Sequence, residues 1–492
     1  MAIKKSLACL IIFIFCLLFF SFRLPEVPRG MTIDEAAFGY NASLISQTLR
    51  DENGRFLPVF VLSLQGRDWR QPVAQYLQVA SYKIFGRSLL NLKLVSVLAA
   101  AVSGLLIYLL AVDLKNRLLG WAALLVFITS PVILIHSHLA LDNIMPVPFI
   151  LVWLIGLLKF EKNRSVKFLV LSAISLGIGF YAHKSMRSAA PVWTLATAGY
   201  LTFTQIKDWR IFSLKNYRLP VLFLISIAPF YLISPVLDYK YAGAVYGTQN
   251  LSTNSIYDFF YFYISNFDLS FLFIKGDTIL HHSTGRHGMF LLITLPVFIY
   301  GLFKSFSLKN KFFIFLAICF FAGPFFISFV GSIHRASRIV FLTPLFALIC
   351  GLGIIELIKL TGYAFKTLTV LLLFLALFNV YDFLNYYWFR YAQDTYNIFY
   401  SPVGIDAYKK LDEVSKKENL IPLISEDLLK TSGDGGAVED FSRSLYFTRP
   451  NKYKEGSKII AGTAVLSRDS KKTDAEKIET GANGYFIYTA QP

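Results

Sequence analysis

Hydrophobic residues fill most of this chain in runs of about 20, and short polar stretches separate the runs. A run of that length crosses the hydrocarbon core of a membrane as an α-helix. Such runs lie at residues 6–22, 89–112, 118–135, 144–160, 166–182, 188–205, 219–236, 288–304, 311–330, 339–359 and 365–385. The pattern predicts an all-α polytopic membrane protein with about eleven transmembrane helices.

Two longer stretches, residues 23–88 and 237–287, interrupt the apolar runs. In the first of them, apolar side chains recur at helical spacing over residues 34–49 and again over residues 73–85, directly after Pro72. We expect two amphipathic helices in this loop, lying at the membrane interface.

The C-terminal part of the chain has a different composition. Residues 389–492 are charged and mixed, and they include the strand-like pieces KIIAGTAVL and YFIYTA. The sequence therefore predicts a transmembrane domain over residues 1–388 and a small α/β domain over residues 389–492.

Composition excludes a soluble globular protein, because 55% of the residues are hydrophobic and only 16% are charged. Soluble domains carry roughly a quarter charged residues. The net charge of +17 does not indicate nucleic-acid binding, since the excess Lys and Arg lie mostly in short connections between apolar runs.

These basic connections predict the orientation of the chain. Examples are Lys115 with Arg117 and Lys207 with Arg210, which all fall on one side if every run crosses the membrane. By the positive-inside rule that side is the cytoplasm. We expect a multi-pass protein of the cytoplasmic (inner) membrane with a cytoplasmic N-terminus, an uncleaved first span and an extracytoplasmic C-terminal domain.

The cysteines predict neither disulfides nor a structural zinc site. Cys9, Cys16, Cys319 and Cys350 all lie inside apolar runs, and no pair has the spacing of metal ligands.

Acidic residues on the predicted outer side are candidates for catalysis. Asp34 and Glu35 are adjacent at the start of the first amphipathic helix, and Asp142 follows the third apolar run. A carboxylate there is suited to act as a general base that accepts a proton from a hydroxyl group. The alternative is a structural role at the helix start, with Thr32 or Asp34 as the N-cap and Glu35 favourably placed near the helix dipole, and the two interpretations stay open.

Basic residues form two clusters on the same side. His183, Lys184 and Arg187 lie in YAHKSMRSAAP, and Arg335 and Arg338 lie in GSIHRASRIV. Arginine at a membrane surface is a natural partner of phosphate, because its guanidinium group donates two parallel hydrogen bonds. Contact with lipid head groups is the alternative explanation.

Further polar residues complete the set of candidates. Arg70, Tyr181, His138 and His282 are expected to contact the substrate. His136, His138 and Asp142 also contain metal-ligating groups, but their spacing is loose, so we predict no metal site and keep a divalent ion as an alternative.

As a set, these motifs resemble membrane glycosyltransferases of the GT-C class. The segments DEAAFGYNA, RDENG, LPVF and IFG resemble the first outer loop of the dolichyl-phosphate-mannose–protein mannosyltransferase family (family 39) and of the related aminoarabinose transferases. HSHLALDN, YAHKSMRSAAP, FIKGDTILHHSTGRHG and GSIHRASRIVFLTP resemble later elements of that family in the same order. One departure is His138, which stands where Arg is common in the family.

The resemblance implies a transferase that takes one sugar from a polyprenyl-phosphate carrier at the outer membrane face. It places Asp34 at the catalytic acid of the family with Glu35 as its neighbour, and Asp142 at the second acidic position. It places Arg187 and Arg338 near the carrier phosphate.

We therefore expect inverting transfer of a single sugar, such as a mannose, to a hydroxyl group of a protein, a lipid or a glycan of the cell envelope. The expected partners are the polyprenyl-phosphate sugar, the acceptor and membrane lipids, without nucleic acid. A polytopic lipid or oligosaccharide transporter is the alternative, although charged residues are scarce at the predicted span centres.

Overall fold

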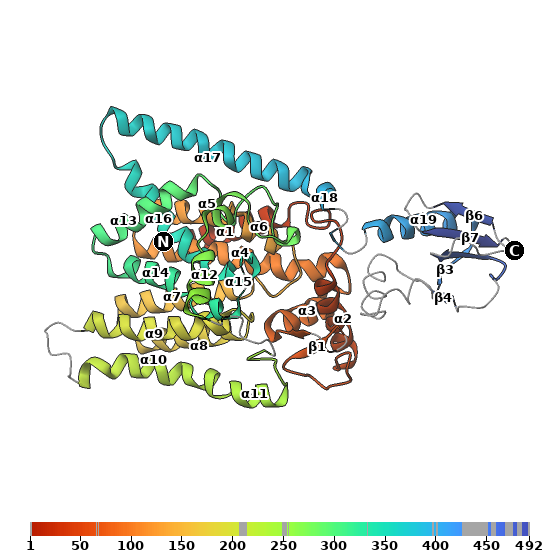
Figure 1. Ribbon diagram of the computed structural model, residues 1–492, viewed down its shortest axis with the longest axis horizontal. Helices are drawn as coiled ribbons and strands as arrows, with labels where there is room; N and C mark the ends of the chain where they lie inside the picture. Colours follow the sequence, from red (N-terminus) through yellow and green to blue (C-terminus); the bar gives the residue numbers. More distant parts are fainter. Residues whose placement is uncertain are drawn as a thin grey trace. The chain divides into compact units, whose positions relative to one another are not determined.

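The chain divides into two compact units. The helical unit comprises residues 1–22, 71–74 and 96–389, and the loop unit comprises residues 23–70, 75–95 and 390–492. The computed structural model describes residues 2–64, 66, 68–205, 214–247, 253, 255–331, 333–395, 398–399, 402–425, 451–453, 459–467, 476–479 and 485–490 (Figure 1). The predicted cytoplasmic residues Lys207 and Arg210 lie outside these ranges.

A helix occupies each of the predicted apolar runs. These helices are α1 (Ala2–Ser21), α4 (Leu89–Leu114), α5 (Arg117–Ile128), α6 (Pro131–Ser137), α7 (Pro146–Asn163), α8 (Val166–Phe180), α9 (Met186–Gln205), α10 (Leu214–Leu232), α13 (Thr294–Ser307), α14 (Lys311–Ala322), α16 (Thr343–Ile358) and α17 (Tyr363–Phe389). Shorter helices in the connections are α11 (Ser234–Lys240), α12 (Ile256–Ser265), α15 (Ala336–Ile339) and α18 (Tyr391–Asp394).

The predicted number of eleven spans is not confirmed. Within the described residues, five helical segments are long and apolar enough to cross a membrane, or six if a bent pair counts as one span. The pair is α5 with α6, which meet at 63°. Pro131 is the first residue of α6, where its missing N–H removes no helical hydrogen bond. The mostly helical, multi-pass membrane character of the chain is confirmed.

Glycines allow two of these helices to approach closely. A Cβ added at Gly301 in α13 would overlap the carbonyl oxygen of Ile349 in α16, and one added at Gly353 in α16 would overlap that of Val297. Small residues have this role in many membrane helix pairs, where close packing replaces the hydrophobic effect as the source of association.

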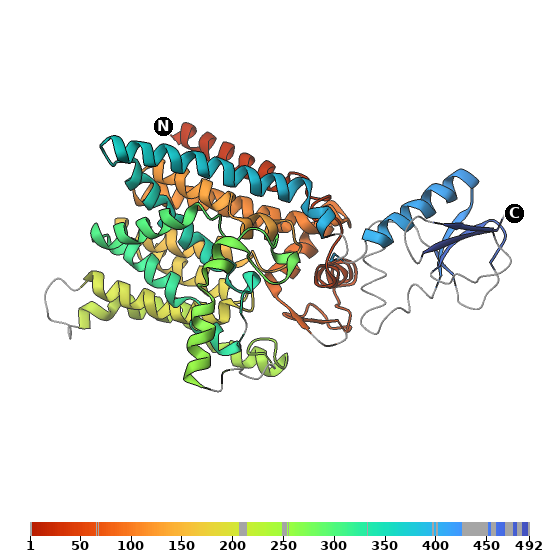
Figure 2. The same ribbon diagram turned by 45° about the horizontal axis from the view of Figure 1, so that its top comes forward.

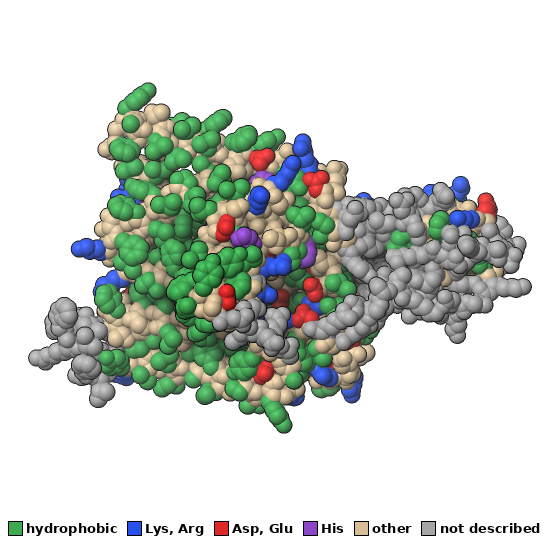
Figure 3. All heavy atoms as spheres, viewed as in Figure 1, with side chains coloured by type: hydrophobic (Ala, Val, Ile, Leu, Met, Phe, Trp, Pro, Cys, Tyr) green, Lys and Arg blue, Asp and Glu red, His purple; other side chains and the backbone are tan. Residues whose placement is uncertain are grey.

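Helix α17 is the most exposed of the long apolar helices. Only 6% of its apolar stretch is buried. Figure 3 shows hydrophobic side chains along the helix, at the top of the view. Leu373, Phe374 and Phe378 are each at least 60% exposed. In water such a face is unfavourable, so it indicates contact with lipid.

Both predicted loop helices are present between residues 23 and 88. These are α2 (Ile33–Thr48) and α3 (Pro72–Phe85), and both helix predictions are confirmed. Between them β1 (Val61–Ser63) and β2 (Asp68–Arg70) form an antiparallel pair, in which Ser63 is opposite Asp68.

The described C-terminal residues form a helix and a mixed sheet (Figure 2). The helix is α19 (Pro402–Glu418), and the sheet order is β4-β3-β5-β7-β6. The strands are β3 (Ile421–Ser425), β4 (Asn451–Tyr453), β5 (Thr463–Ser467), β6 (Glu476–Glu479) and β7 (Phe486–Ala490). Strand β3 runs parallel to β4 and β5, and β7 runs antiparallel to β5 and β6. Leu411 of α19 shares a buried cluster with Leu466 and Ile487.

Candidate functional site

The N-terminus of α2 shows which of its acidic residues forms the cap. Thr32 is the N-cap, and its hydroxyl accepts a hydrogen bond from the Glu35 amide at 3.2 Å. The Glu35 carboxylate accepts from the Thr32 amide at 2.7 Å, which completes a capping box. Glu35 is fully buried. The cap interpretation therefore applies to Thr32 and Glu35, and the capping box does not use Asp34.

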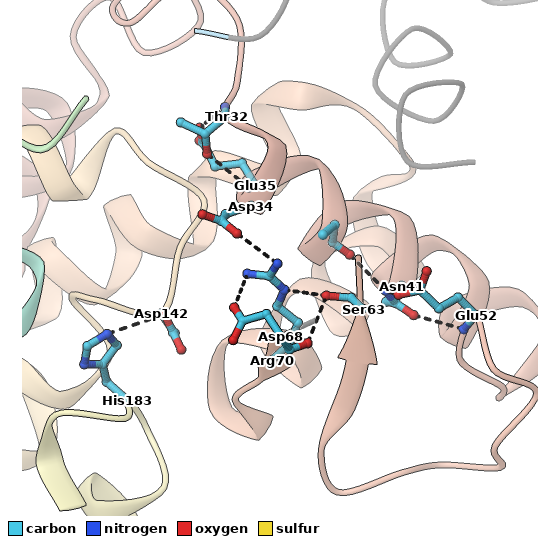
Figure 4. Close-up of polar contacts among 11 residues, drawn as sticks. Thr32, Asp34, Glu35, Asn41, Glu52, Ser63, Asp68, Arg70, Asp142 and His183 are labelled. Atoms are coloured by element: carbon cyan, nitrogen blue, oxygen red, sulfur yellow. Dashed lines mark hydrogen bonds and ion pairs between the residues drawn. The ribbon is translucent and has the colours of Figure 1, made fainter. Parts of the chain in front are cut away.

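The carboxylate of Asp34 instead faces Arg70 (Figure 4). Arg70 Nη2 donates to Asp34 Oδ1 at 2.9 Å, and Arg70 Nε donates to the Ser63 hydroxyl at 2.7 Å. Asp68 lies 3.3 Å from Nη1, and the guanidinium group lies 5.1 Å from the centre of the Phe38 ring.

Exposure separates the roles of the two charged partners. The Asp34 side chain is 42% exposed, whereas that of Arg70 is 4% exposed. Arg70 was expected to contact the substrate. In the structure it contacts Asp34, Ser63 and Asp68, and these contacts suit it to hold the Asp34 carboxylate in a fixed orientation. An exposed carboxylate that is held at one oxygen can still accept a proton at the other.

A second polar contact joins α2 to the loop that follows it. Asn41 Nδ2 donates to Glu52 Oε1 at 2.9 Å, and the Glu52 amide donates to Asn41 Oδ1 at 3.0 Å. Burial raises the pKa of the Glu52 carboxyl above its usual value. The RDENG motif thus fixes the loop against α2. Sequence reasoning did not include Asn41 or Glu52 among the site residues.

In the helical unit, Asp142 faces His183 (Figure 4). His183 Nε2 lies 3.8 Å from Asp142 Oδ1. The Ser185 amide donates to His183 Nδ1 at 3.2 Å, so that nitrogen is an acceptor and the proton of the neutral ring is on Nε2. Burial, aided by Lys184 and Arg187 nearby, lowers the pKa of His183 to about 3. His183 therefore presents a neutral N–H toward Asp142.

Arg187 holds the backbone of the second long loop. Its Nη1 donates to the carbonyl oxygens of Ala244 at 2.6 Å and Val245 at 2.8 Å, and its Nη2 donates to the Gln71 side chain. Tyr181, two residues before His183, donates to the Phe230 carbonyl at 2.7 Å. Arg187 and Tyr181 are thus engaged in internal contacts, which the sequence did not predict.

His138 is buried completely and connects two helices. Its Nε2 lies 2.9 Å from the Phe20 carbonyl of α1, so it donates there, and its Nδ1 accepts from the Tyr387 hydroxyl of α17 at 3.1 Å. Both ring nitrogens are thus hydrogen-bonded inside the protein, and in the structure His138 links α1 to α17. The set of His136, His138 and Asp142 is not assembled, and no group of three or more His, Cys, Asp or Glu among the described residues is arranged to hold a metal ion.

The second basic cluster depends on Asp277, which the sequence analysis did not single out. Asp277 Oδ2 accepts from the Ala336 amide at 2.5 Å, and Oδ1 accepts from the Ile279 amide at 2.8 Å. Arg335 Nη1 lies 3.8 Å from Asp277 Oδ1. Burial raises the pKa of Asp277. Asp277 therefore joins the KGD segment to the segment that carries Arg335 and Arg338.

Residues after the KGD segment contact α17 and α6. His287 Nε2 lies 3.0 Å from Asp382, and Arg286 lies 4.8 Å from the centre of the Tyr386 ring. His282 stacks on His136, with ring centres 5.1 Å apart and planes at 10°. Within the helical unit, the structure thus brings His136, His183, His282 and Arg335 close enough to influence one another electrostatically.

The sequence and the fold both match known membrane glycosyltransferases. The family model described as dolichyl-phosphate-mannose-protein mannosyltransferase matches residues 70–237. No curated protein sequence matches the chain. The resemblance to the GT-C class is therefore confirmed by a family model over this part of the chain.

Solved structures extend the likeness to most of the fold. ArnT from Cupriavidus metallidurans, solved bound to undecaprenyl phosphate, is 13% identical, with a TM-score of 0.56 over 91% of this chain and 86% of its own. The archaeal oligosaccharyltransferase AglB from Archaeoglobus fulgidus, in complex with an inhibitory peptide and a dolichol-phosphate, is 12% identical, with a TM-score of 0.52 over 89% of this chain and 64% of its own. At these identities the likeness is one of fold.

Proposed function

We propose that this chain transfers a single sugar from a polyprenyl-phosphate donor to an acceptor hydroxyl at the outer face of the cytoplasmic membrane. The observation that carries the proposal is the exposed carboxylate of Asp34 at the start of α2, which the buried Arg70 of β2 holds in place. The family match adds support, as do the ligands bound in the two structures of similar fold, undecaprenyl phosphate and dolichol-phosphate.

The proposed reaction is one displacement at the anomeric carbon. Asp34 accepts the proton of the acceptor hydroxyl while its oxygen attacks that carbon. The bond from carbon to the phosphate oxygen breaks, and the polyprenyl phosphate leaves with the electron pair. Attack from the face opposite the leaving group inverts the configuration.

Basic residues offset the charge of the departing phosphate. We assign this role to Lys184 and Arg338, with Arg187 contributing its charge while it holds the second long loop. Asp142 and the neutral N–H of His183 form a second polar pair, suited to orienting a sugar hydroxyl. Glu35 acts through the helix cap rather than by touching the substrate.

Replacement of Asp34 by Asn tests the base. The neutral amide cannot accept the proton, so turnover falls by about 10²–10⁴-fold. The assay uses purified protein, a panel of radiolabelled polyprenyl-phosphate sugars and membrane extract as acceptor. Asp258→Asn is the matched control, because Asp258 also lies in the first turn of a loop helix, α12. Turnover near that of the wild type in Asp34→Asn would rule out this base.

A transporter would need buried charged residues along a pathway, and the buried Lys93 does not support one. The fully buried Lys93 donates to the carbonyl oxygens of Pro28 at 3.2 Å and Gly30 at 2.9 Å. These contacts give Lys93 a structural role within the loop unit, where it holds the backbone at Pro28 and Gly30. The same labelled donors distinguish the functions, since transport moves the label without forming a new glycosidic bond.

A further inference from the structure

The stacked rings of His136 and His282 each contain a buried nitrogen that the mechanism above does not use. His136 Nδ1 lies 2.8 Å from the Val132 carbonyl oxygen. A carbonyl only accepts, so Nδ1 carries the proton, and Nε2 of the neutral ring is an acceptor. Nε2 is buried and makes no hydrogen bond to any described residue, and His136 is 1% exposed.

His282 has a similar buried nitrogen. Its Nδ1 makes no hydrogen bond within the described part of the chain, and the residue is 9% exposed. Burial, with His136, His281, Arg335 and His183 around it, lowers the pKa of His282 well below its usual value. The ring is therefore neutral, which is compatible with stacking on a second imidazole.

Arg335 adds a donor to this cluster. Its Nη1 is buried and forms no hydrogen bond to the described residues, although Asp277 lies 3.8 Å away. Asp277 fixes the backbone on which Arg335 lies through the Ala336 amide. An acceptor on His136, a neutral nitrogen on His282 and a donor on Arg335 thus belong to one cluster of the helical unit.

The chemistry of this cluster favours a hydroxylated ligand. Buried polar groups are nearly always hydrogen-bonded, so the two imidazole nitrogens call for partners beyond the described residues. Arg335 Nη1 can donate a hydrogen bond in addition to its ion pair with Asp277. An ionised phosphate oxygen has no hydrogen to donate to His136 Nε2, whereas a sugar hydroxyl both donates and accepts.

We propose that His136, His282 and Arg335 bind the hydroxyl groups of the transferred sugar and so determine which sugar is accepted. One hydroxyl donates to His136 Nε2, a second bonds with His282 Nδ1, and Arg335 Nη1 donates to an oxygen of the same sugar. This inference rests on the proposed transferase function. It assigns His136 and His282 to sugar specificity rather than to phosphate or metal binding.

Deoxy donors test the inference directly. A buried site built to bond a hydroxyl discriminates strongly against an analogue that lacks it. The probes are the polyprenyl-phosphate sugar that is active in the assay above and its monodeoxy analogues. We expect at least one analogue to be used with a kcat/KM about 100-fold below that of the parent by the wild-type protein.

His136→Phe and His282→Phe keep an aromatic ring and remove the nitrogens. We expect each variant to lose about 10- to 100-fold in kcat/KM with the parent donor. For one deoxy analogue per variant, the preference for the parent should fall to within about threefold. His281→Phe is the matched control, because it removes a neighbouring imidazole and should retain the wild-type preference.

The preference ratio keeps the test independent of protein yield or stability, and His136→Gln gives a second variant where Phe reduces folding. An unchanged ratio in the variants at both positions overturns the inference, including the case in which the nitrogens only bind water. Absence of transfer by the wild-type protein from every donor would instead contradict the proposed function. The two failures are therefore distinguishable.

Discussion

At the scale of single residues, neighbours in sequence have separate roles. Glu35 is buried in the capping box of α2, while Asp34, one residue earlier, keeps an exposed carboxylate beside Arg70. From the sequence, either Thr32 or Asp34 could be the N-cap, and Glu35 was favourably placed near the helix dipole. The distinction depends on the Thr32 hydroxyl and on β2, which brings Arg70 from 36 residues away.

Arg70→Lys tests whether this arginine orients Asp34. A lysine keeps the charge but cannot contact Asp34, Asp68 and Ser63 together from one rigid plane. We expect kcat to fall about 10- to 100-fold with little change in KM, because the base is misplaced while substrate contacts remain. Arg55→Lys is the control, since Arg55 lies over Trp69 in the same unit. A larger effect on KM than on kcat would instead indicate direct substrate binding by Arg70.

The buried neutral imidazole of His183 predicts a dependence of stability on pH. Its pKa is about 3 in the folded protein and about 6.5 when exposed. Between these values the unfolded chain binds a proton that the folded chain excludes, so acidification favours unfolding. The free energy of unfolding should fall by up to about 1.4 kcal/mol per pH unit below about 6.5.

Thermal unfolding in detergent between pH 7.5 and 5 measures this effect. His183→Gln removes the titrating group and should show a shallower loss of stability than the wild type over the same interval. The comparison isolates His183 from other groups, including Asp277, whose raised pKa acts in the opposite direction. Equal slopes for the two proteins would show that His183 is already protonated in the folded state.

At the scale of elements, the arrangement of the site depends on residues that hold one element against another. The 3-residue strand β2 places Arg70, and Asp277 joins two loops that lie far apart in the sequence. Periodicity locates such helices and loops well, because each element sets its own spacing of apolar residues. It does not say which elements meet, since that depends on side chains from several of them.

Gly301→Ala tests the close contact between α13 and α16. The added methyl group would overlap the Ile349 carbonyl oxygen, which belongs to a helix backbone and cannot yield easily. We expect a loss of about 1–3 kcal/mol in stability, seen as a lower unfolding temperature in detergent. Gly199→Ala in α9 is the matched control, because a Cβ there meets no atom within 4 Å. A Gly301→Ala protein as stable as the control would show that the helices can separate at little cost.

At the scale of the whole molecule, the orientation in the membrane is the next quantity to measure. Lys83 in α3 and Lys167 in α8 are exposed and are predicted to lie on opposite sides. Cysteines introduced at these positions, after replacement of the four native cysteines by Ala, report the side. A membrane-impermeant maleimide added to intact cells should label Lys83→Cys and leave Lys167→Cys unlabelled until the cells are opened. The reverse pattern would place the loop unit in the cytoplasm.

The sequence by itself determined the membrane class, the apolar segments that form helices and the two loop helices. Those properties follow from local composition and periodicity, which each segment carries alone. It also picked out Asp34, Asp142 and the basic clusters, because charges are costly in such a chain and their positions are informative.

Only the tertiary structure decided what each of those side chains contacts. Glu35 bonds within the helix cap, and Arg70 bonds to Asp34. Arg187 bonds to a loop backbone, and His138 connects two helices. It also revealed the stack of His136 on His282, which come from segments far apart in the chain. Hydrogen bonds and stacking need atoms within a few ångströms in a fixed direction, and only folding brings distant residues to that separation.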